Sequence, residues 1–186
     1  MLPLSPLWRV GGGADGDLGR VAAIHEASPN ATLVADVNEA WTAEQLVVYL
    51  PVLAKMGVRM LEQPLPAGDD EALQHINRII QICADESCMS RESLPSLAGR
   101  YDMVNIKLDK TGGLTEALAL AREARMAGLE IMVGCMPGTS LAMAPAMVVG
   151  AYAPWVDTPL FRTRDREHGL RYECGKVYPP TSKLWG

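Results

Sequence analysis

A parallel α/β fold, specifically a (β/α)₈-type barrel, is predicted by two observations on the sequence. Short apolar runs that end in a polar residue recur along the chain, and the last residues of successive runs lie 22 to 27 positions apart. The stretches between them carry helical spacing and capping signals, so the repeated unit is a strand followed by a helix. Regular units of this length favour a barrel over an open doubly wound sheet.

The expected strands share an apolar body and a polar end. They are Trp8–Val10, Thr32–Asp36, Arg59–Glu62, Ile82–Asp85, Met103–Lys107, Glu130–Gly134 and Trp155–Asp157. A closed barrel needs eight units, and we count five full ones, a last strand and the end of a leading one, so the front of the barrel is expected to be truncated. We assign residues 1–161 to a partial barrel of strands 2 to 8, and residues 162–186 to a C-terminal tail that packs on it.

The stretches between these strands begin and end like helices. Thr42 and Gln45 have the spacing of a capping box, and Gly57 and Gly128 stand where a helix C′ glycine belongs. Pro51 lies inside one such stretch, so we expect it to kink or shorten that helix.

Composition narrows the classes of partner. The chain has 186 residues, 48% of them hydrophobic and 21% charged, with a net charge of −5. That describes one folded domain, and without a basic run it excludes nucleic acid and membrane surfaces as expected partners. The four cysteines form no CxxC pair and follow no secretory leader, which predicts a reduced, cytoplasmic protein.

Three carboxylates end successive expected strands: Asp36, Glu62 and Asp85. In a barrel the active site gathers at these strand ends. Like charges on one rim repel one another unless a cation neutralises them, and oxygen ligands suit Mg²⁺. The alternative is that each acid merely caps the helix after it, which is less economical for three in succession.

Lys107 ends the next expected strand. A lysine beside a metal could act as a base, or it could only balance a neighbouring carboxylate. A metal and an amine base on adjacent strands suggest abstraction of a proton α to a carboxylate, with the metal stabilising the enediolate.

The runs VADVNEAW, MLEQPLP, CADES and VNIKLDKTGGL, in this order and spacing, closely resemble motifs of the enolase superfamily's muconate-lactonising branch, above all its dipeptide epimerases. The resemblance implies that Asp36, Glu62 and Asp85 bind Mg²⁺ and that Lys107 is one of two acid/base lysines. It also implies a capping domain ahead of the barrel, to which nothing in this sequence corresponds. The run GCMPGTS, residues 134–140, resembles the family's seventh-strand loop, which places Cys135, Met136 and Ser140 against the substrate.

Two positions depart from the pattern of that family. Arg9 stands where the family has its second lysine, and arginine is a poor base because it stays protonated. The family's dipeptide epimerases hold the substrate ammonium group with an Asp-x-Asp pair, and here Asp157 is followed by Thr158 and Pro159. Loss of the second acid favours an N-acylated substrate.

These features together predict an isomerase that epimerises or racemises a carbon α to a carboxylate, with Mg²⁺ as cofactor and a small molecule as partner. A dipeptide such as L-Ala-D/L-Glu is the first expectation for the substrate, and an N-acyl amino acid is the alternative. The non-enzymatic alternative is an inactive fragment or a half-barrel that needs a partner. An incomplete barrel has open edges through which copies could associate as a homo-oligomer.

Overall fold

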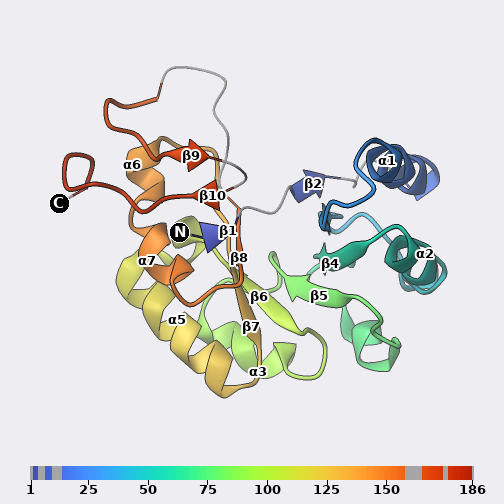
Figure 1. Cartoon of the computed structure of the whole chain (residues 1–186). Coiled ribbons are helices and arrows are strands. Elements are labelled where there is room, and N and C mark those ends of the chain that lie inside the picture. Colours follow the sequence, from blue (N-terminus) through green and yellow to red (C-terminus); the bar gives the residue numbers. More distant parts are fainter. Residues whose placement is uncertain (1, 4–6, 10–13, 158–164, 174–175, 186) are drawn as a thin grey trace. The chain divides into compact units, whose positions relative to one another are not determined.

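The computed structural model of the chain describes residues 2–3, 7–9, 14–157, 165–173 and 176–185 (Figure 1). It divides into two compact units, each described here by itself. The N-terminal unit contains residues 6–88 and 95–103, and the C-terminal unit contains residues 1–5, 89–94 and 104–186. No helix within the described ranges is both long enough and apolar enough to cross a membrane.

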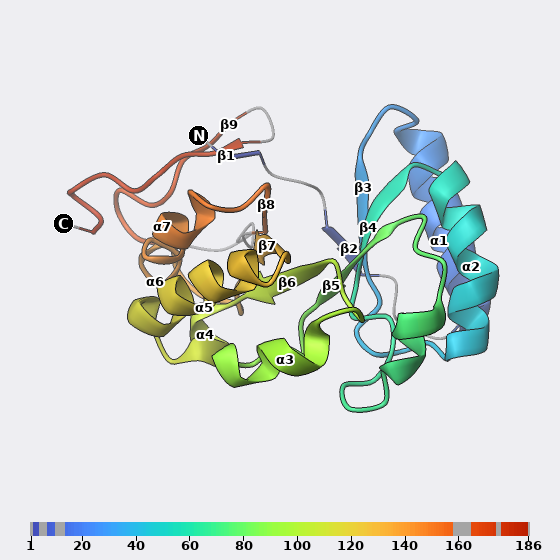
Figure 2. The ribbon, with the colours of Figure 1, turned by 90° about the horizontal axis from the view of Figure 1, so that it is seen from below.

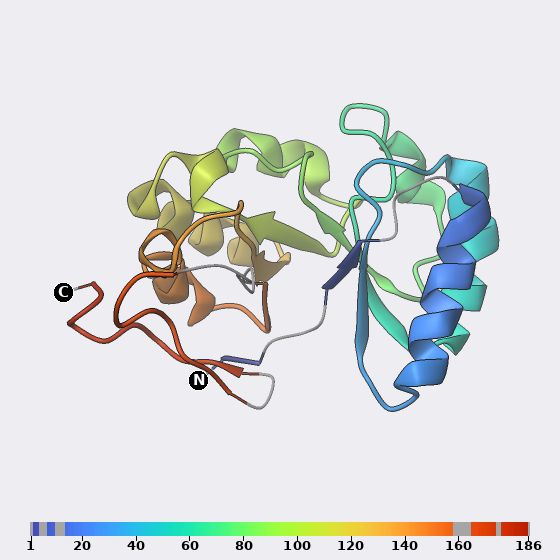
Figure 3. The ribbon, with the colours of Figure 1, turned by 90° about the horizontal axis from the view of Figure 1, so that it is seen from above.

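The N-terminal unit alternates strands and helices. In chain order its elements are β2 (Leu7–Arg9), α1 (Ala14–Ala27), β3 (Leu33–Asp36), α2 (Ala43–Lys55), β4 (Val58–Glu62), the 3₁₀ helix η1 (Glu71–His75) and β5 (Gln81–Ala84), and α3 (Leu94–Leu97) lies at its border with the other unit. The four strands pair in parallel and in chain order. Helices α1 and α2 pack side by side on one face of this sheet (Figures 2 and 3).

Helix α2 begins as the sequence predicts and continues further than expected. Thr42 and Gln45 form the complete capping box, with each side chain accepting from the other residue's backbone N–H. Pro51 does not shorten the helix, which runs on to Lys55. The proline lies on the exposed face, where Val47, the residue whose carbonyl loses its N–H partner, is 55% exposed and open to water.

A buried acid joins α1 to the loop after β3. The Asp17 side chain is fully buried, and it accepts a hydrogen bond of 2.7 Å from Nε1 of Trp41. Arg20, one turn further along α1, pairs with the other carboxylate oxygen of Asp17. A buried charge is tolerated only when it is paired and hydrogen-bonded, so these contacts fix where the loop at Trp41 lies.

The C-terminal unit also alternates strands and helices. Its elements are β1 (Leu2–Pro3), η2 (Arg91–Ser93), β6 (Met103–Ile106, whose first residue is grouped with the N-terminal unit), α4 (Leu108–Thr111), α5 (Leu114–Met126), β7 (Glu130–Val133), α6 (Ser140–Met143), α7 (Ala146–Gly150), β8 (Trp155–Val156), β9 (Tyr172–Glu173) and β10 (Lys176–Val177). Strands β7 and β8 pair in parallel, whereas β1, β10 and β9 form a separate antiparallel sheet.

All seven expected strands occur within two residues of their predicted bounds, apart from Val10, which lies outside the described residues. The glycines expected to end helices do so: Gly57 and Gly128 each have φ of 81°, in the left-handed region that glycine enters without strain. The expected boundary between barrel and tail, 161/162, falls in 158–164, also outside the described residues.

Burial along α2 predicts which of its residues hold the fold. Leu53 is fully buried, whereas its neighbour Val52 is 40% exposed. We expect Leu53→Ala to lower the free energy of unfolding by about 2–5 kcal/mol, because it leaves a cavity. The matched variant Val52→Ala should cost about 0.5 kcal/mol or less. Urea unfolding followed by circular dichroism measures both, and equal losses would contradict this account of the core.

Candidate active site

The three predicted metal ligands all lie in the N-terminal unit, at the carboxyl ends of neighbouring parallel strands. Asp36, the last residue of β3, is in register with Glu62, the last residue of β4. Glu62 is in turn in register with Cys83 of β5, and Asp85 follows Cys83 by two residues. Because side chains alternate along a strand, residues in register or two apart lie on the same face. The sheet therefore presents Asp36, Glu62 and Asp85 on one face at one edge.

These carboxylates are buried in a region of negative charge. Asp36, Glu62 and Asp85 are 2%, 1% and 3% exposed. Beside them, burial raises the pKa of Glu86, and the negative charges of Asp85 and Asp36 raise it further. One buried oxygen of Glu86 has no hydrogen-bond partner among the described residues. Several carboxylates thus act on one another here, which is the situation that a bound cation relieves.

The donor chemistry of this edge fits Mg²⁺, a hard cation that takes oxygen ligands. The fit rests on the shared strand edge, the burial and the mutual repulsion seen at Glu86. In the described part of the chain, however, no group of three or more His, Cys, Asp or Glu side chains is arranged to hold a metal ion. The metal-ligand role of these three residues therefore stays a prediction.

Gln63 links the ends of β4 and β5, and sequence reasoning did not identify it. Its side-chain oxygen accepts hydrogen bonds from the backbone N–H groups of Asp85, at 2.8 Å, and of Ser87, at 3.1 Å. Its Nε2 lies within hydrogen-bond distance of the carbonyl of Leu65 and the hydroxyl groups of Ser87 and Tyr101. Gln63 directly follows Glu62, so one fully buried amide fixes the backbone at two of the predicted ligands.

Asp70 belongs to the same hydrogen-bond network. Its carboxylate accepts hydrogen bonds from Ser87 and Tyr101, both at 2.6 Å, and pairs with Arg100 at 2.8 Å. Burial alone would raise the pKa of Asp70, but these three donors outweigh it and hold the pKa below its ordinary value. The Ser87 hydroxyl is therefore held by hydrogen bonds within this network, which argues against a nucleophilic role.

Asn38 makes a second link, between the loops that follow β3 and β5. Its backbone N–H donates to Asp36 at 2.9 Å, and its side-chain amide donates to Glu86 at 2.6 Å. Asn38 and Glu39 both have positive φ, of 53° and 65°, and Gln63 has φ of 34°. Non-glycine residues in this region cost free energy and gather at functional sites. All three follow a predicted metal ligand within three residues.

Lys107, Cys135 and Asp157 lie together in the C-terminal unit. Lys107 directly follows β6 and is 6% exposed. Burial raises the pKa of the Cys135 thiol to about 12, the charge of Asp157 adds to that rise, and the charge of Lys107 opposes it. The thiol also lies 3.7 Å from the carbonyl oxygen of Asp157. A thiol that stays protonated is a poor nucleophile, which argues against a nucleophilic role for Cys135.

The predicted pocket loop, residues 134–140, divides into two environments. At its start, a Cβ on Gly134 would come within 2.6 Å of the Asn105 side chain, so any larger residue there would force that side chain to shift. Met136 is 45% exposed. At its end, the Ser140 hydroxyl donates to Asp165 and accepts from the N–H of Leu170 at 2.9 Å. Ser140 is thus tied to the C-terminal tail, and its substrate contact stays a prediction.

Arg9 is described only through its backbone. It ends β2 in register with Asp36. The predicted position of the opposing base is therefore at the same strand edge as the carboxylates, whereas Lys107 belongs to the other unit.

Parallel β/α units with acids and a lysine at the carboxyl ends of the strands are typical of barrel domains whose functional sites lie at those ends. A family model narrows the class further: residues 8–183 match the enolase C-terminal domain-like family. The chain belongs to this family, and its resemblance to dipeptide epimerases of the enolase superfamily is confirmed.

Two curated relatives of similar sequence have named activities. The chain is 50% identical over 161 residues to an L-Ala-D/L-Glu epimerase from Escherichia coli K12, covering 86% of this chain and 50% of the relative. It is 47% identical over 171 residues to an N-acetyl-D-glutamate racemase from a Pseudoalteromonas species. That match covers 91% of this chain and 54% of the relative. The chain therefore spans about half the length of the curated relatives it matches.

The solved structures extend the similarity to the whole described fold. An enolase family member from Agrobacterium tumefaciens, with homology to dipeptide epimerases and with bound sodium and L-Ala-L-Glu, superposes with a TM-score of 0.89 at 40% identity, covering 100% of this chain and 64% of that one. A dipeptide epimerase from Cytophaga hutchinsonii, complexed with Mg and D-Ala-L-Val, superposes with a TM-score of 0.84 at 29% identity. The match covers 95% of this chain and 52% of that one. The predicted partial barrel is confirmed.

The Asp70 network predicts a pH dependence. A carboxyl with a lowered pKa in the folded state stabilises the protein above its unfolded pKa, and that contribution is lost as pH falls through the folded value. Asp70→Asn should therefore be less stable than the natural chain at pH 7, and the difference should shrink below about pH 4. Urea midpoints measured across this range test it, with the exposed neighbour variant Asp69→Asn as the control. A difference that stays constant with pH would contradict the assignment.

The Asn38 link predicts an effect on metal affinity. Removal of the amide in Asn38→Ala frees Glu86 and the loop that carries Asp36, and losses of this kind typically weaken metal binding about 10- to 100-fold. The rise of the thermal midpoint with Mg²⁺ concentration measures the affinity. Asn77→Ala, which removes an exposed amide in the same unit, should leave the Mg²⁺ response unchanged. Equal responses in the two variants would exclude a role for Asn38.

Proposed function

We propose that this chain carries the metal-binding carboxylates and an acid/base lysine of an isomerase that epimerises or racemises the carbon α to a carboxylate. The observation that carries the proposal is the register of Asp36 with Glu62 at buried ends of adjacent strands, extended by Asp85. Relatives at 50% and 47% identity are an epimerase and a racemase, both named for substrates that contain glutamate.

Asp36, Glu62 and Asp85 would hold Mg²⁺. Support comes from their oxygen donors, their burial and the Mg present with dipeptide in the structure of the Cytophaga hutchinsonii enzyme. When bound, the cation supplies positive charge that favours loss of the proton next to a carboxylate. Gln63 and Asn38 keep the loops that carry these acids in place.

Lys107 would move the substrate α-proton on one face. Its amine is buried beside Cys135 and Asp157, so a substrate there would be shielded from water. Arg9 stands at the position of the opposing base, and a guanidinium holds its proton far more tightly than an amine. An enzyme with one effective base removes the α-proton and returns a proton on the same face of the carbon. The α-proton then exchanges with solvent, but the configuration of the carbon is inverted only slowly. Solvent exchange is therefore a better first measurement than epimerisation.

A dipeptide such as L-Ala-D/L-Glu is the first proposed substrate. An N-acyl amino acid is the second, because Thr158 follows Asp157 where the dipeptide epimerases of the family continue toward a second acid. The racemase among the relatives, named for an N-acetylated glutamate, supports this alternative. Comparing L-Ala-L-Glu with N-acetyl-L-glutamate separates the two, since only the first carries an ammonium group.

The setting of the enzyme is also a proposal. We infer a reduced, cytoplasmic location from the four scattered cysteines, which form no CxxC pair. We infer a homo-oligomer from the open edges of an incomplete barrel. The competing, non-enzymatic interpretation is a fragment that is inactive without a partner.

The decisive experiment follows loss of the substrate α-proton signal by proton NMR in D₂O with Mg²⁺ present. Lys107→Ala should reduce the exchange rate by about 10²-fold or more, as expected for removal of a general base. Lys55→Ala, at an exposed helix end, should exchange at the rate of the natural chain. Undiminished exchange in Lys107→Ala would overturn the assignment. No exchange in the natural chain would favour the inactive or partner-dependent fragment.

A further inference from the structure

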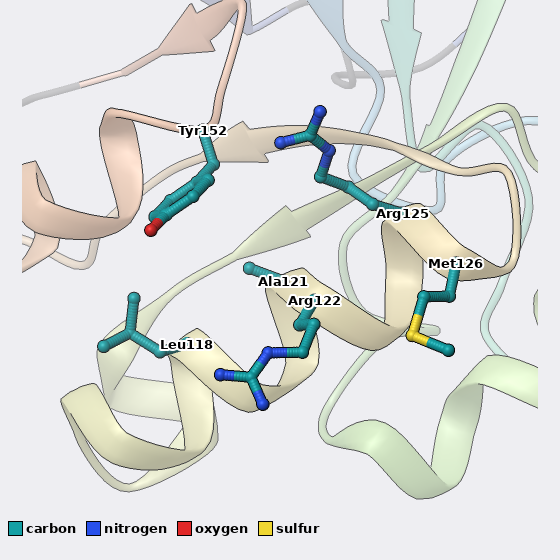
Figure 4. A pocket seen from close by; sticks show the side chains of 6 residues that line it. All are labelled: Leu118, Ala121, Arg122, Arg125, Met126 and Tyr152. Carbon is teal, nitrogen blue, oxygen red and sulfur yellow. The ribbon is translucent and has the colours of Figure 1, made fainter.

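A hollow in the C-terminal unit lies between α5 and the turn that follows α7. It has a volume of about 370 Å³ and is lined by Leu118, Ala121, Arg122, Arg125, Met126 and Tyr152 (Figure 4). Figure 4 shows Tyr152 facing α5 across this hollow. Pockets for small molecules start at about 300 Å³. The hollow is thus large enough for one small molecule, and none of the predicted active-site residues line it.

One face of α5 supplies most of the lining. Leu118, Ala121, Arg122 and Arg125 are spaced i, i+3, i+4 and i+7, which places them on the same side of a helix. The lining is apolar along the first half of this face and carries two guanidinium groups along the second. Tyr152, from the turn after α7, adds an aromatic ring opposite.

The two arginines differ from a third arginine in the same unit. Arg91 forms salt bridges with two acids of α5, Glu116 at 2.7 Å and Glu123 at 2.9 Å. Within the described part of the chain, Arg122 and Arg125 form no ion pair and no hydrogen bond through their side chains. Among the described residues, the guanidinium groups of Arg122 and Arg125 thus have no acid at ion-pair distance, on a chain whose net charge is −5. Glu130 lines a second hollow together with Arg125 and Tyr152.

Two of the side chains that line the hollow are open to water. Met126 is 81% exposed and Tyr152 is 52% exposed. A flexible thioether and an aromatic ring are side chains that adapt to and cover apolar ligands. An occupant that places apolar atoms against them and an anionic group at the arginines would satisfy both halves of the lining.

We propose that this hollow binds a small carboxylic acid with an aromatic or branched aliphatic body. The carboxylate accepts hydrogen bonds from the guanidinium group of Arg125, whose planar donors match two carboxylate oxygens and which Figure 4 shows on the side of α5 that faces Tyr152. The Arg122 guanidinium points away from that of Arg125 and adds positive charge to the same helix face. The apolar body lies against Leu118, Met126 and Tyr152. The site is separate from the proposed catalytic residues, so it stands or falls independently of the proposed function.

The test uses the whole chain labelled with ¹³C at the methionine methyl groups, with the Met126 signal assigned through Met126→Leu. Titration with 4-phenylbutyrate at constant ionic strength should shift this signal saturably, with a dissociation constant of about 1 mM or below. 4-Phenylbutanol, which lacks the charge, and acetate, which lacks the apolar body, should each bind at least tenfold more weakly. Either of them binding as well as the acid would overturn the proposal.

Variants show whether the arginines recognise the ligand. Arg122 and Arg125 are exposed, so Arg122→Gln with Arg125→Gln should fold normally and bind 4-phenylbutyrate at least tenfold more weakly. The control Arg59→Gln, at an exposed position on β4, should bind within twofold of the natural chain. Unchanged binding in the double variant would overturn the proposal. So would a concentration-dependent Met126 shift without ligand, because it would mean that a second copy of the chain covers the hollow.

Discussion

Register between parallel strands is the constraint on which the rest of the candidate site depends. Asp36 stands beside Glu62 because β3 and β4 pair with their last residues level, and β5 extends the row to Asp85. A slip of one residue would turn one carboxylate toward the opposite face of the sheet. The hydrogen bonds of Gln63 to the backbone after β5 oppose such a slip at the point where it would do most harm. The polar network is therefore part of the fold as much as of the site.

Much of this arrangement could be predicted from the sequence, because it depends on spacing and on strong local signals. The recurrence of apolar runs identified the strands, and the capping box at Thr42 identified the start of α2. Pro51 was expected to kink or shorten its helix, and the shortening does not occur. A proline ends a helix when its lost hydrogen bond cannot be replaced, and at an exposed position water replaces it. Solvent exposure at a single position depends on packing, which the local rule does not contain.

The supporting residues could not be predicted in the same way. Apart from Leu65, the partners of Gln63 lie 22 to 38 positions away, and those of Asp70 lie 17 to 31 positions away. No periodicity marks an amide or an acid whose role is to satisfy distant backbone and hydroxyl groups. The signal that could have drawn attention to Gln63 is its place directly after Glu62. Asn38 carries a similar signal two residues after Asp36.

The pairing of β1 with β10 has a consequence for how the chain folds. It joins Leu2 to Val177, so nearly the whole chain lies between the two strands. Closing so long a loop costs entropy that two short strands repay poorly, so this small sheet should form after the β/α units rather than guide them. On the ribosome, β1 is synthesised well before β10 and has to wait for it. Strand β1 is thus ordered late, although it precedes the β/α units in this chain, and its place depends on the tail.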